Sequence, residues 1–471
     1  MNKVKAFLTK LNSMSPAAKA SFWFIVSNIV LKGISFITTP IFTRLLDVSD
    51  YGVSNLFTTW EGIISIFATL SLSGGVYNVA MTKYEKDVDA VTSSLIGLTA
   101  LTSIFVYTCC IIINLIFPNL FELNTGYLVF MWIQTFFNAT TAFWLMRKRF
   151  TFDYKKVIAY TFSNAILSPV VAIIAVYFST ENKAYAKVIG SGLWPILIGT
   201  IIMILLVFKG KKLYHKEYWK FALKFNIPLL PHYLANGTVG SIGKLMLNYF
   251  YNTAYVGLYG IAGSITGVMN IVTGSINNSL IPHTLQSIKK GTIKGLNKSI
   301  KRYLILIAIV CSGIMLFSRE AILIIATPEY MDAIWFVSPL VLVTFIAFLS
   351  GIIGNIVFYY EETKFMSFAT MVTAVSNVVL NFLGIKLFGP YAVGYVSLIT
   401  GLIRFFMYYF TAKRFEKNLK EIISLKFVFT LFLLLFVIMI LSLVFWNNLI
   451  MKMLLLGVVG ILVILFRKHI F

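Results

Sequence analysis

Charged side chains inside long apolar runs are the residues of this sequence that point most directly to chemistry. Lys32 and Glu61 lie in consecutive apolar runs, each roughly 14–16 Å from the shared end at ~1.5 Å per residue. A charge in lipid costs at least about 2.5–3.5 kcal/mol, so it usually faces a cavity or a partner. The two residues indicate either a structural ion pair, or a cationic site whose charge Glu61 balances, or a carboxylate that binds a coupling ion.

Three further cations lie within or beside apolar runs. Lys244 either snorkels to the interface or, together with Lys32, attracts an anionic ligand. Arg44 ends the first run, where it is either an interfacial anchor or a guard of the outer mouth. Arg404 lies nearer the opposite end of its run, where it either contacts a headgroup or helps to bind substrate.

Amides follow helical spacing in two runs. Gln134 and Asn138 are four residues apart, as are Asn377 and Asn381. Residues at this spacing share one face of a helix. Such stripes face the interior of a bundle, where they form interhelical hydrogen bonds or line a cavity for sugar hydroxyls.

One run carries helix-breaking residues. Pro228 and Pro231 precede closely spaced glycines at 237, 240 and 243. Proline interrupts the helical hydrogen-bond ladder, and glycine permits bending or close packing. Pro228, Pro231, Gly237, Gly240 and Gly243 therefore form either a gate or hinge, or a static kink.

The elements that must position these residues are membrane helices. The chain has 471 residues, of which 59% are hydrophobic and 12% charged, with a mean hydropathy of +0.86. About 20 consecutive apolar residues span the hydrocarbon layer as a helix, whereas barrel strands alternate in runs of about ten. The apolar runs do not alternate, so we expect an all-α integral membrane protein without a soluble domain.

Apolar runs between charged or Gly/Pro breaks predict about fourteen transmembrane helices. Lys and Arg concentrate in alternate loops, which places both termini on the cytoplasmic side. The predicted spans are 20–43, 52–80, 91–117, 127–146, 157–179, 188–208, 225–250, 255–285, 303–326, 334–359, 366–385, 392–412, 427–446 and 449–466.

The chain also contains an internal sequence repeat. FTRLLDVSDYGVSNLF follows the first span and LNYFYNTAYVGLYGIA follows the seventh, with Gly52 and Gly257 in corresponding places. Six spans separate the copies, which favours two six-helix lobes related by a pseudo-two-fold axis normal to the membrane. The expected organisation is a cytoplasmic segment (1–19), an N-lobe (20–208), a basic linker (209–224), a C-lobe (225–412), and a basic loop with two final spans (413–471).

Several functions find no support in the sequence. The net charge of +23 is gathered in the loops, which is typical of topology signals and lipid headgroup contacts rather than nucleic-acid binding. The four histidines lack metal-ligand spacing, and no catalytic triad or Walker motif is present. The connections are too short for a catalytic domain. We expect no enzyme activity, no metal site and no cofactor apart from coupling H⁺ or Na⁺.

The two repeated segments, with their "TRLLxxxDYG" and "VGLYGIA" patterns, resemble Wzx-type polysaccharide and O-antigen flippases of the multidrug/oligosaccharidyl-lipid/polysaccharide exporter superfamily. The resemblance covers most of residues 20–412. It implies two lobes around a cationic cavity, with Lys32, Lys244 and Arg44 on helices that line it. The family often has an acidic–basic pair where this chain reads GKLMLN, and only Lys244 is present here.

The resemblance implies a flippase of the bacterial cytoplasmic membrane. Its substrate would be an undecaprenyl-diphosphate-linked oligosaccharide for capsule, exopolysaccharide or O-antigen, moved by alternating access. Membrane lipids, a polysaccharide polymerase and chain-length machinery would be its partners. A multidrug–cation antiporter and a flippase for lipid-linked peptidoglycan precursor are alternatives from the same superfamily. A membrane polysaccharide polymerase is disfavoured, because it would need a sizeable external loop.

Overall fold

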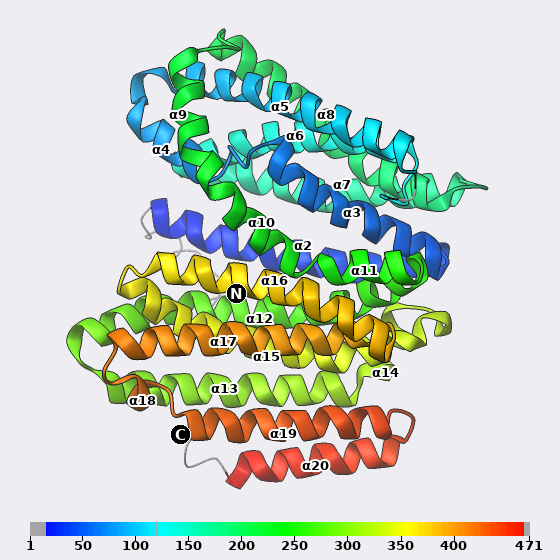
Figure 1. Cartoon of the computed structure of the whole chain (residues 1–471), viewed down its shortest axis with the longest axis vertical. Helices are drawn as coiled ribbons and strands as arrows, with labels where there is room; N and C mark the ends of the chain where they lie inside the picture. The colour runs from blue at the N-terminus through cyan, green and yellow to red at the C-terminus, as the bar shows by residue number, and fades with distance from the viewer. Residues whose placement is uncertain (1–15, 119, 466–471) are drawn as a thin grey trace, which may run out of the picture. The chain divides into compact units, whose positions relative to one another are not determined.

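A computed structural model of the chain describes residues 16–118 and 120–465, and within these ranges every regular element is a helix (Figure 1). The expected all-α class is therefore confirmed. Among the described residues, ten helices are long and apolar enough to cross a membrane. These are α5 (Val88–Ile116), α6 (Thr125–Phe150), α7 (Tyr154–Phe178), α8 (Lys183–Gly210), α12 (Thr253–Lys290), α13 (Ile293–Leu316), α15 (Ile334–Tyr359), α16 (Thr363–Phe388), α17 (Ala392–Phe415) and α19 (Leu425–Val444).

Other helices complete the described chain. Three of them have seventeen or more residues: α2 (Pro16–Leu45), α3 (Val48–Ala68) and α20 (Leu449–Leu465). The shorter α-helices are α4 (Gly75–Lys83), α9 (Lys216–Asn226), α10 (Leu230–Val239), α11 (Ile242–Phe250), α14 (Ser318–Ile325) and α18 (Leu419–Ile422). The 3₁₀ helices are η1 (Glu85–Asp87), η2 (Ile227–Leu229) and η3 (Pro328–Ala333).

Two predicted spans are interrupted in the structure. The run 52–80 forms α3 and α4 with a turn between them, where Leu70 and Ser71 both have φ of +49°. Ser71, Ser73 and the adjacent glycines favour this turn over a helix. The run 225–250 contains the 3₁₀ turn η2 at Pro228, which cannot donate a backbone hydrogen bond. A second interruption at residues 240–241 separates α10 from α11. Apolar length alone overestimated the continuity of both helices.

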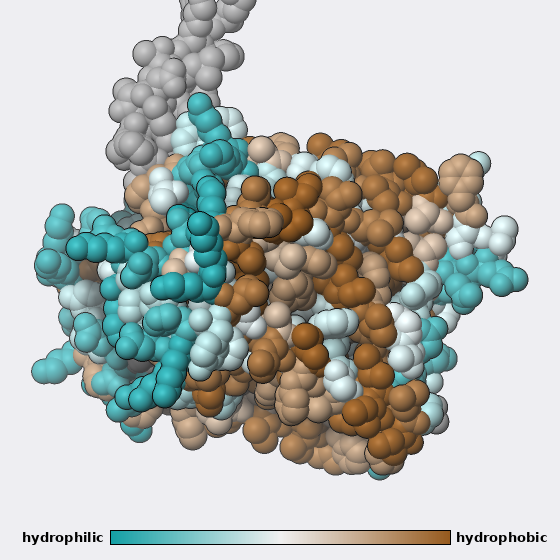
Figure 2. Space-filling view, turned by 90° about the horizontal axis from the view of Figure 1, so that it is seen from above, coloured by the Kyte–Doolittle hydropathy of each residue, from teal (hydrophilic) through white to brown (hydrophobic). Residues whose placement is uncertain are grey.

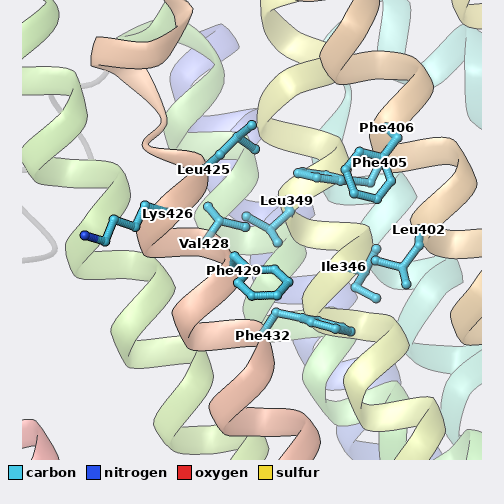
Figure 3. Close-up of a pocket in the computed structure, with 10 residues that line it drawn as sticks. All are labelled: Ile346, Leu349, Leu402, Phe405, Phe406, Leu425, Lys426, Val428, Phe429 and Phe432. Carbon is cyan, nitrogen blue, oxygen red and sulfur yellow. The ribbon is translucent and has the colours of Figure 1, made fainter.

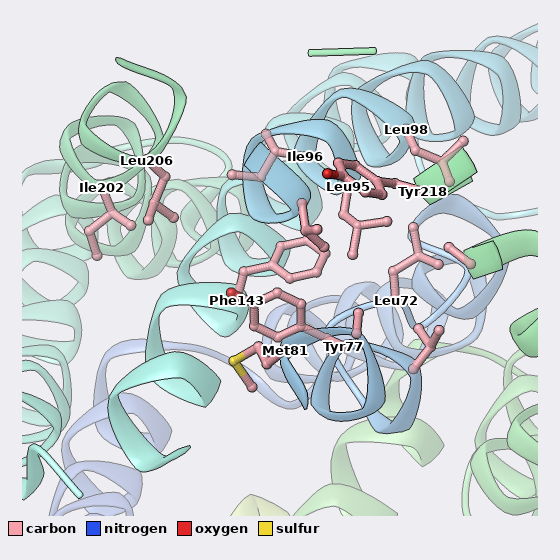
Figure 4. Close-up of a cluster of buried hydrophobic side chains, with 14 residues drawn as sticks. Leu72, Tyr77, Met81, Leu95, Ile96, Leu98, Phe143, Ile202, Leu206 and Tyr218 are labelled. Carbon is pink, nitrogen blue, oxygen red and sulfur yellow. The ribbon is translucent and has the colours of Figure 1, made fainter. Parts of the chain in front are cut away.

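The chain forms two compact units. One comprises residues 1–46 and 53–237, and the other comprises 47–52 and 238–471. The first unit has a buried core in which α4 packs with α5, α6, α8 and α9 (Figure 4). Tyr77 and Phe143 meet edge to face at 5.0 Å, and the Tyr77 hydroxyl lies 2.6 Å from Thr92 Oγ1. This core anchors the α3–α4 turn beside the polar residues described below.

The second unit is organised around α15. This helix is apolar on all sides and contacts α12, α13, α16, α17 and α19, as expected for a helix at the centre of a bundle. Helices α13, α19 and α20 lie on one side of it in the ribbon view (Figure 1). The two units thus provide separate frameworks for the predicted site residues.

Candidate functional site

The first unit contains a carboxylate held by two amides. Glu61 on α3 accepts hydrogen bonds from Gln134 Nε2 at 3.1 and 3.2 Å, and from Asn138 Nδ2 at 3.4 Å. Both amides come from the stripe that the sequence places on one face of α6. No described cation lies within ion-pair distance of Glu61. The carboxylate is therefore held by neutral donors.

This carboxylate opens into a polar cavity of about 310 Å³. The cavity volume lies at the lower end of the range for ligand pockets, ~300–1,000 Å³. Hydroxyls dominate its lining, which suits a ligand rich in hydroxyl groups or a hydrated ion. The lining residues are Thr58, Glu61, Gly62, Ser65, Thr69, Ser73, Thr135, Asn138, Ala139 and Ala142.

Neighbouring contacts hold α6 in place behind this cavity. The Thr135 hydroxyl lies 2.8 Å from the buried Tyr107 hydroxyl of α5. On the other side, a Cβ at Gly192 of α8 would lie 2.5 Å from Gln134 Oε1. That oxygen is buried and has no hydrogen-bond partner among the described atoms. Gln134 is thus confined between α3 and α8 with its amide nitrogen directed at Glu61.

The first unit also contains a partly buried cation that the sequence does not predict. Lys187 on α8 donates to Ser54 Oγ on α3 at 2.7 Å, and its Nζ lies 4.9 Å from the centre of the Phe42 ring. Residue 187 lies just outside the predicted span 188–208, so hydropathy places it in a loop. Ser54 lies on the same helix as Glu61, roughly 10 Å away at ~1.5 Å per residue. Helix α3 therefore contacts both a cation and an amide pair.

The predicted cations of the first helix are placed by α2. Lys32 lies on this helix, but its side chain is outside the described residues, so its pairing with Glu61 stays a prediction. Arg44 is exposed in the last turn of α2, where Nη1 donates to the Pro40 carbonyl at 2.8 Å. The structure thus leaves Arg44 accessible at a helix end.

The predicted residues of the second unit lie on three helices. Lys244 on α11 is half-buried and forms no ion pair with a described carboxylate. Arg404 on α17 is also half-buried, and its Nε has no partner among the described atoms.

The second amide stripe forms an interhelical network. Asn377 on α16 donates to Thr400 Oγ1 on α17 at 3.2 Å, and Asn381 donates to Asn377 Oδ1 at 3.0 Å. Their exposed fractions are 1% and 0%. In this conformation these amides stabilise the contact between α16 and α17. They form interhelical hydrogen bonds, which is one of the two roles expected for such a stripe.

The predicted hinge residues coincide with interruptions of the helix. Pro228 lies in η2, Pro231 is the second residue of α10, and the helix is broken between Val239 and Ile242. Gly237 and Gly240 are exposed. Gly243 differs from them, because a Cβ there would lie 2.5 Å from Val393 Cγ1, so it serves close packing of α11 on α17.

The second unit contains an ion pair between a buried lysine and a partly exposed glutamate, which the sequence does not predict. Lys452 on α20 has a side chain that is 1% exposed, and its Nζ lies 2.8 and 2.9 Å from the two oxygens of Glu320 on α14. The predicted span 449–466 contains Lys452, but no local pattern indicates its partner. The Arg319–Glu320 distance is 3.9 Å, so Lys452 is the nearer partner. Among the described residues, no group of histidine, cysteine or acidic side chains could hold a metal ion.

Comparison with solved structures identifies the fold. The chain matches the lipid II flippase MurJ in an inward closed conformation with a TM-score of 0.66 and 16% identity, covering 95% of this chain and 99% of that one. It also matches an inward-facing multidrug resistance MATE family transporter of the MOP superfamily with a TM-score of 0.56 and 13% identity, covering 82% and 95%. The chain therefore has a fold of the MOP type.

Sequence comparisons identify the family. A protein of the Lsg locus of Haemophilus influenzae is 22% identical over 410 residues, which is 84% of this chain and 98% of the relative. Residues 17–289, more than half of the chain, match the family described as polysaccharide biosynthesis protein. The resemblance to polysaccharide exporters found in the sequence is confirmed by this match. The chain is a multi-pass membrane protein that belongs to the polysaccharide biosynthesis protein family.

Proposed function

We propose that the protein is a flippase that moves undecaprenyl-diphosphate-linked oligosaccharide repeat units across the bacterial cytoplasmic membrane. The product would enter capsule, exopolysaccharide or O-antigen synthesis, with a polymerase and chain-length machinery acting on it afterwards. The family match over residues 17–289 is the observation that carries this proposal. Its relatives by fold are a flippase and a multidrug transporter, which favours transport over enzymatic catalysis.

The proposed membrane arrangement has fourteen spans. Helices α2, α3 and α20 and the broken α10–α11 pair would join the ten helices that are long and apolar enough on their own. Two groups of six would form the lobes, and α19 and α20 would follow as an appendage. Both termini would lie in the cytoplasm, since the basic loops favour that side.

The proposed mechanism divides substrate binding between amides, hydroxyls and cations. The hydroxyl-rich cavity beside Glu61 suits sugar hydroxyls, which both donate and accept hydrogen bonds. Lys32 and Lys244, and more weakly Arg44 and Arg404, would attract the diphosphate. Glu61 would balance these cations or bind a coupling H⁺ or Na⁺. The break between α10 and α11 would permit the change between inward and outward access.

Two alternatives have a specific observation in their favour. The likeness to MurJ favours a flippase for lipid-linked peptidoglycan precursor, and the likeness to the MATE transporter favours a drug–cation antiporter. Each makes a different prediction in a deletion strain. Loss of a peptidoglycan flippase impairs cell-wall synthesis, loss of an antiporter raises drug sensitivity, and loss of a repeat-unit flippase removes surface polysaccharide.

The test is deletion of the gene followed by complementation. We expect surface polysaccharide to disappear and lipid-linked repeat units to accumulate on the inner leaflet, where an added periplasmic glycosidase cannot reach them. Drug sensitivity and peptidoglycan synthesis should be unchanged. Normal surface polysaccharide in the deletion strain would overturn the proposal, and a selective effect on drugs or peptidoglycan would support the corresponding alternative.

A further inference from the structure

We propose that the first unit binds an anionic phospholipid of the bilayer at a site separate from the Glu61 cavity. The site has an apolar part between α5 and α8 and a cationic part on α9. The proposal does not depend on which substrate the protein transports.

The apolar part is a groove of about 650 Å³. Ala100 and Ile104 line it from α5, and Met203 and Phe208 line it from α8. Ile104 is 51% exposed and Phe208 is 74% exposed, so the groove opens outward rather than into the bundle. Exposed apolar side chains on a membrane helix face lipid. The groove is therefore available to a hydrocarbon chain.

An aromatic pair closes one end of this groove. The rings of Tyr214 and Trp219 meet edge to face with their centres 4.8 Å apart, and Trp219 Nε1 donates to the Ser94 carbonyl at 2.9 Å. Tyrosine and tryptophan favour the level of lipid headgroups. A Cβ at Gly97 would lie 2.0 Å from the Leu213 carbonyl oxygen, so the loop before α9 rests directly on α5. The end of the groove is thus held in place by α5.

The cationic part begins at the same aromatic pair. A second hollow, of about 660 Å³, is also lined by Tyr214 and Trp219, and it adds Lys216, Lys220 and Lys224 of α9. These lysines recur every four residues, so they lie on one side of the helix. All three are exposed, and none forms an ion pair with a described carboxylate. They can therefore receive the phosphate of a ligand.

The order of these parts matches one lipid molecule. From Ile96 to Ile104 the groove runs roughly 12 Å along α5 at ~1.5 Å per residue, which accommodates the upper part of an acyl chain. The aromatic pair lies where the glycerol region would be, and the lysines follow. In Figure 2 a hydrophobic band adjoins a broad hydrophilic edge, as this arrangement requires. Lysines beside a membrane helix attract anionic headgroups, at about a fivefold gain in binding for each.

The test uses the full-length protein in vesicles that contain a phospholipid with a photoactivatable acyl chain. One set carries phosphatidylglycerol as the probe and the other carries phosphatidylcholine. Crosslinked positions are mapped by mass spectrometry of chymotryptic peptides. We expect labelling of residues 96–104 and 203–208 by phosphatidylglycerol, at least fivefold above labelling by phosphatidylcholine.

A triple variant, Lys216→Gln/Lys220→Gln/Lys224→Gln, should lower this labelling at least fivefold. The matched control is Lys289→Gln/Lys290→Gln/Lys294→Gln, which removes three exposed charges from the second unit and should leave it unchanged. Ala100→Phe, which fills the groove, should lower labelling while all α9 lysines remain. Melting temperatures of all variants establish that they are folded.

Three results would overturn the proposal. Equal labelling by phosphatidylcholine would show that the α9 lysines do not select an anionic headgroup. An equal fall in both triple variants would show a general charge effect. Displacement of the probe by farnesyl diphosphate at concentrations where unlabelled phosphatidylglycerol has no effect would assign the site to a prenyl diphosphate instead.

Discussion

Gly52 and Gly257 face each other within the second unit, where α3 and α12 begin. A Cβ on Gly52 would lie 1.7 Å from the Thr253 carbonyl oxygen, and a Cβ on Gly257 would lie 2.3 Å from the Val48 carbonyl oxygen. Thr253 lies four residues before Gly257, and Val48 lies four residues before Gly52. Each glycine therefore packs against the carbonyl one helical turn before the other glycine, and the contact is reciprocal. The internal sequence repeat between these two segments therefore corresponds to a local two-fold relationship between the starts of α3 and α12.

Gly52→Ala and Gly257→Ala should each destabilise the protein by about 1–3 kcal/mol, because the added methyl group would overlap a backbone oxygen. The double variant should cost less than the sum, since separation of the helices for one methyl group makes room for the other. Thermal unfolding in detergent measures this. Gly263→Ala on α12 is the control: outside the helix's own backbone, no described atom lies within 4 Å of a Cβ there, so it should stabilise by about 0.5–1 kcal/mol. Additive effects would show that the contact is not reciprocal.

Glu320→Gln should destabilise the protein by about 1–3 kcal/mol, because the buried Lys452 would keep only a neutral amide oxygen as its acceptor. The double variant Glu320→Met/Lys452→Met should be closer to the wild type, since it removes both charges together. Thermal unfolding of the two variants tests the pair. Glu329→Gln, at an exposed position, should change stability by no more than about 0.5 kcal/mol. A double variant as unstable as Glu320→Gln would argue that the pair contributes by packing rather than by charge.

Sequence patterns predicted the features that depend on neighbouring residues. Apolar length located the helices, and four-residue spacing placed Gln134 and Asn138 on one face, beside Glu61 in the structure. Contacts between distant parts of the chain were not predictable in this way. The predicted span 449–466 places Lys452 near its start, and no local pattern indicates that Glu320, 132 residues away, pairs with it in the structure.

The same reason applies to Lys187 and to the α3–α4 turn. Hydropathy places Lys187 outside a span, whereas its partners Ser54 and Phe42 belong to helices more than 130 residues earlier. The turn after Ala68 depends on a core in which α4 packs against α9. A local sequence window contains neither set of contacts.

Gly240→Ala should slow transport without lowering stability. Apart from its chain neighbours, no atom of the described residues lies within 4 Å of a Cβ at this position, so the methyl group fits. Alanine favours helix over glycine by about 0.5–1 kcal/mol, which would help α10 and α11 to join as one straighter helix. Export rate in the complemented deletion strain and melting temperature are the two measurements. Gly263→Ala, on unbroken α12, is the matched control, and an unchanged export rate in Gly240→Ala would exclude bending at this position from the transport cycle.

Glu61→Gln should lower export at least tenfold with normal protein levels. The new amide would keep one acceptor oxygen for Gln134 and Asn138 but would replace the other by a donor, and the cavity would lose its negative charge. Glu181→Gln, an exposed position of the same unit, should export normally. Surface polysaccharide and immunoblotting in the complemented deletion strain provide the readouts.

Exchange of the two groups in Glu61→Gln/Gln134→Glu separates charge from position. The pair can form the same hydrogen bond in reverse, with the carboxylate now on α6 and still beside Asn138. Recovery of at least a third of wild-type export would indicate that a carboxylate anywhere in this polar cavity suffices, as expected for balancing cations. Failure to recover, with normal folding, would indicate that the carboxylate must reside on α3, as expected if Glu61 itself binds the coupling ion. Full export by Glu61→Gln alone would remove the carboxylate from the mechanism.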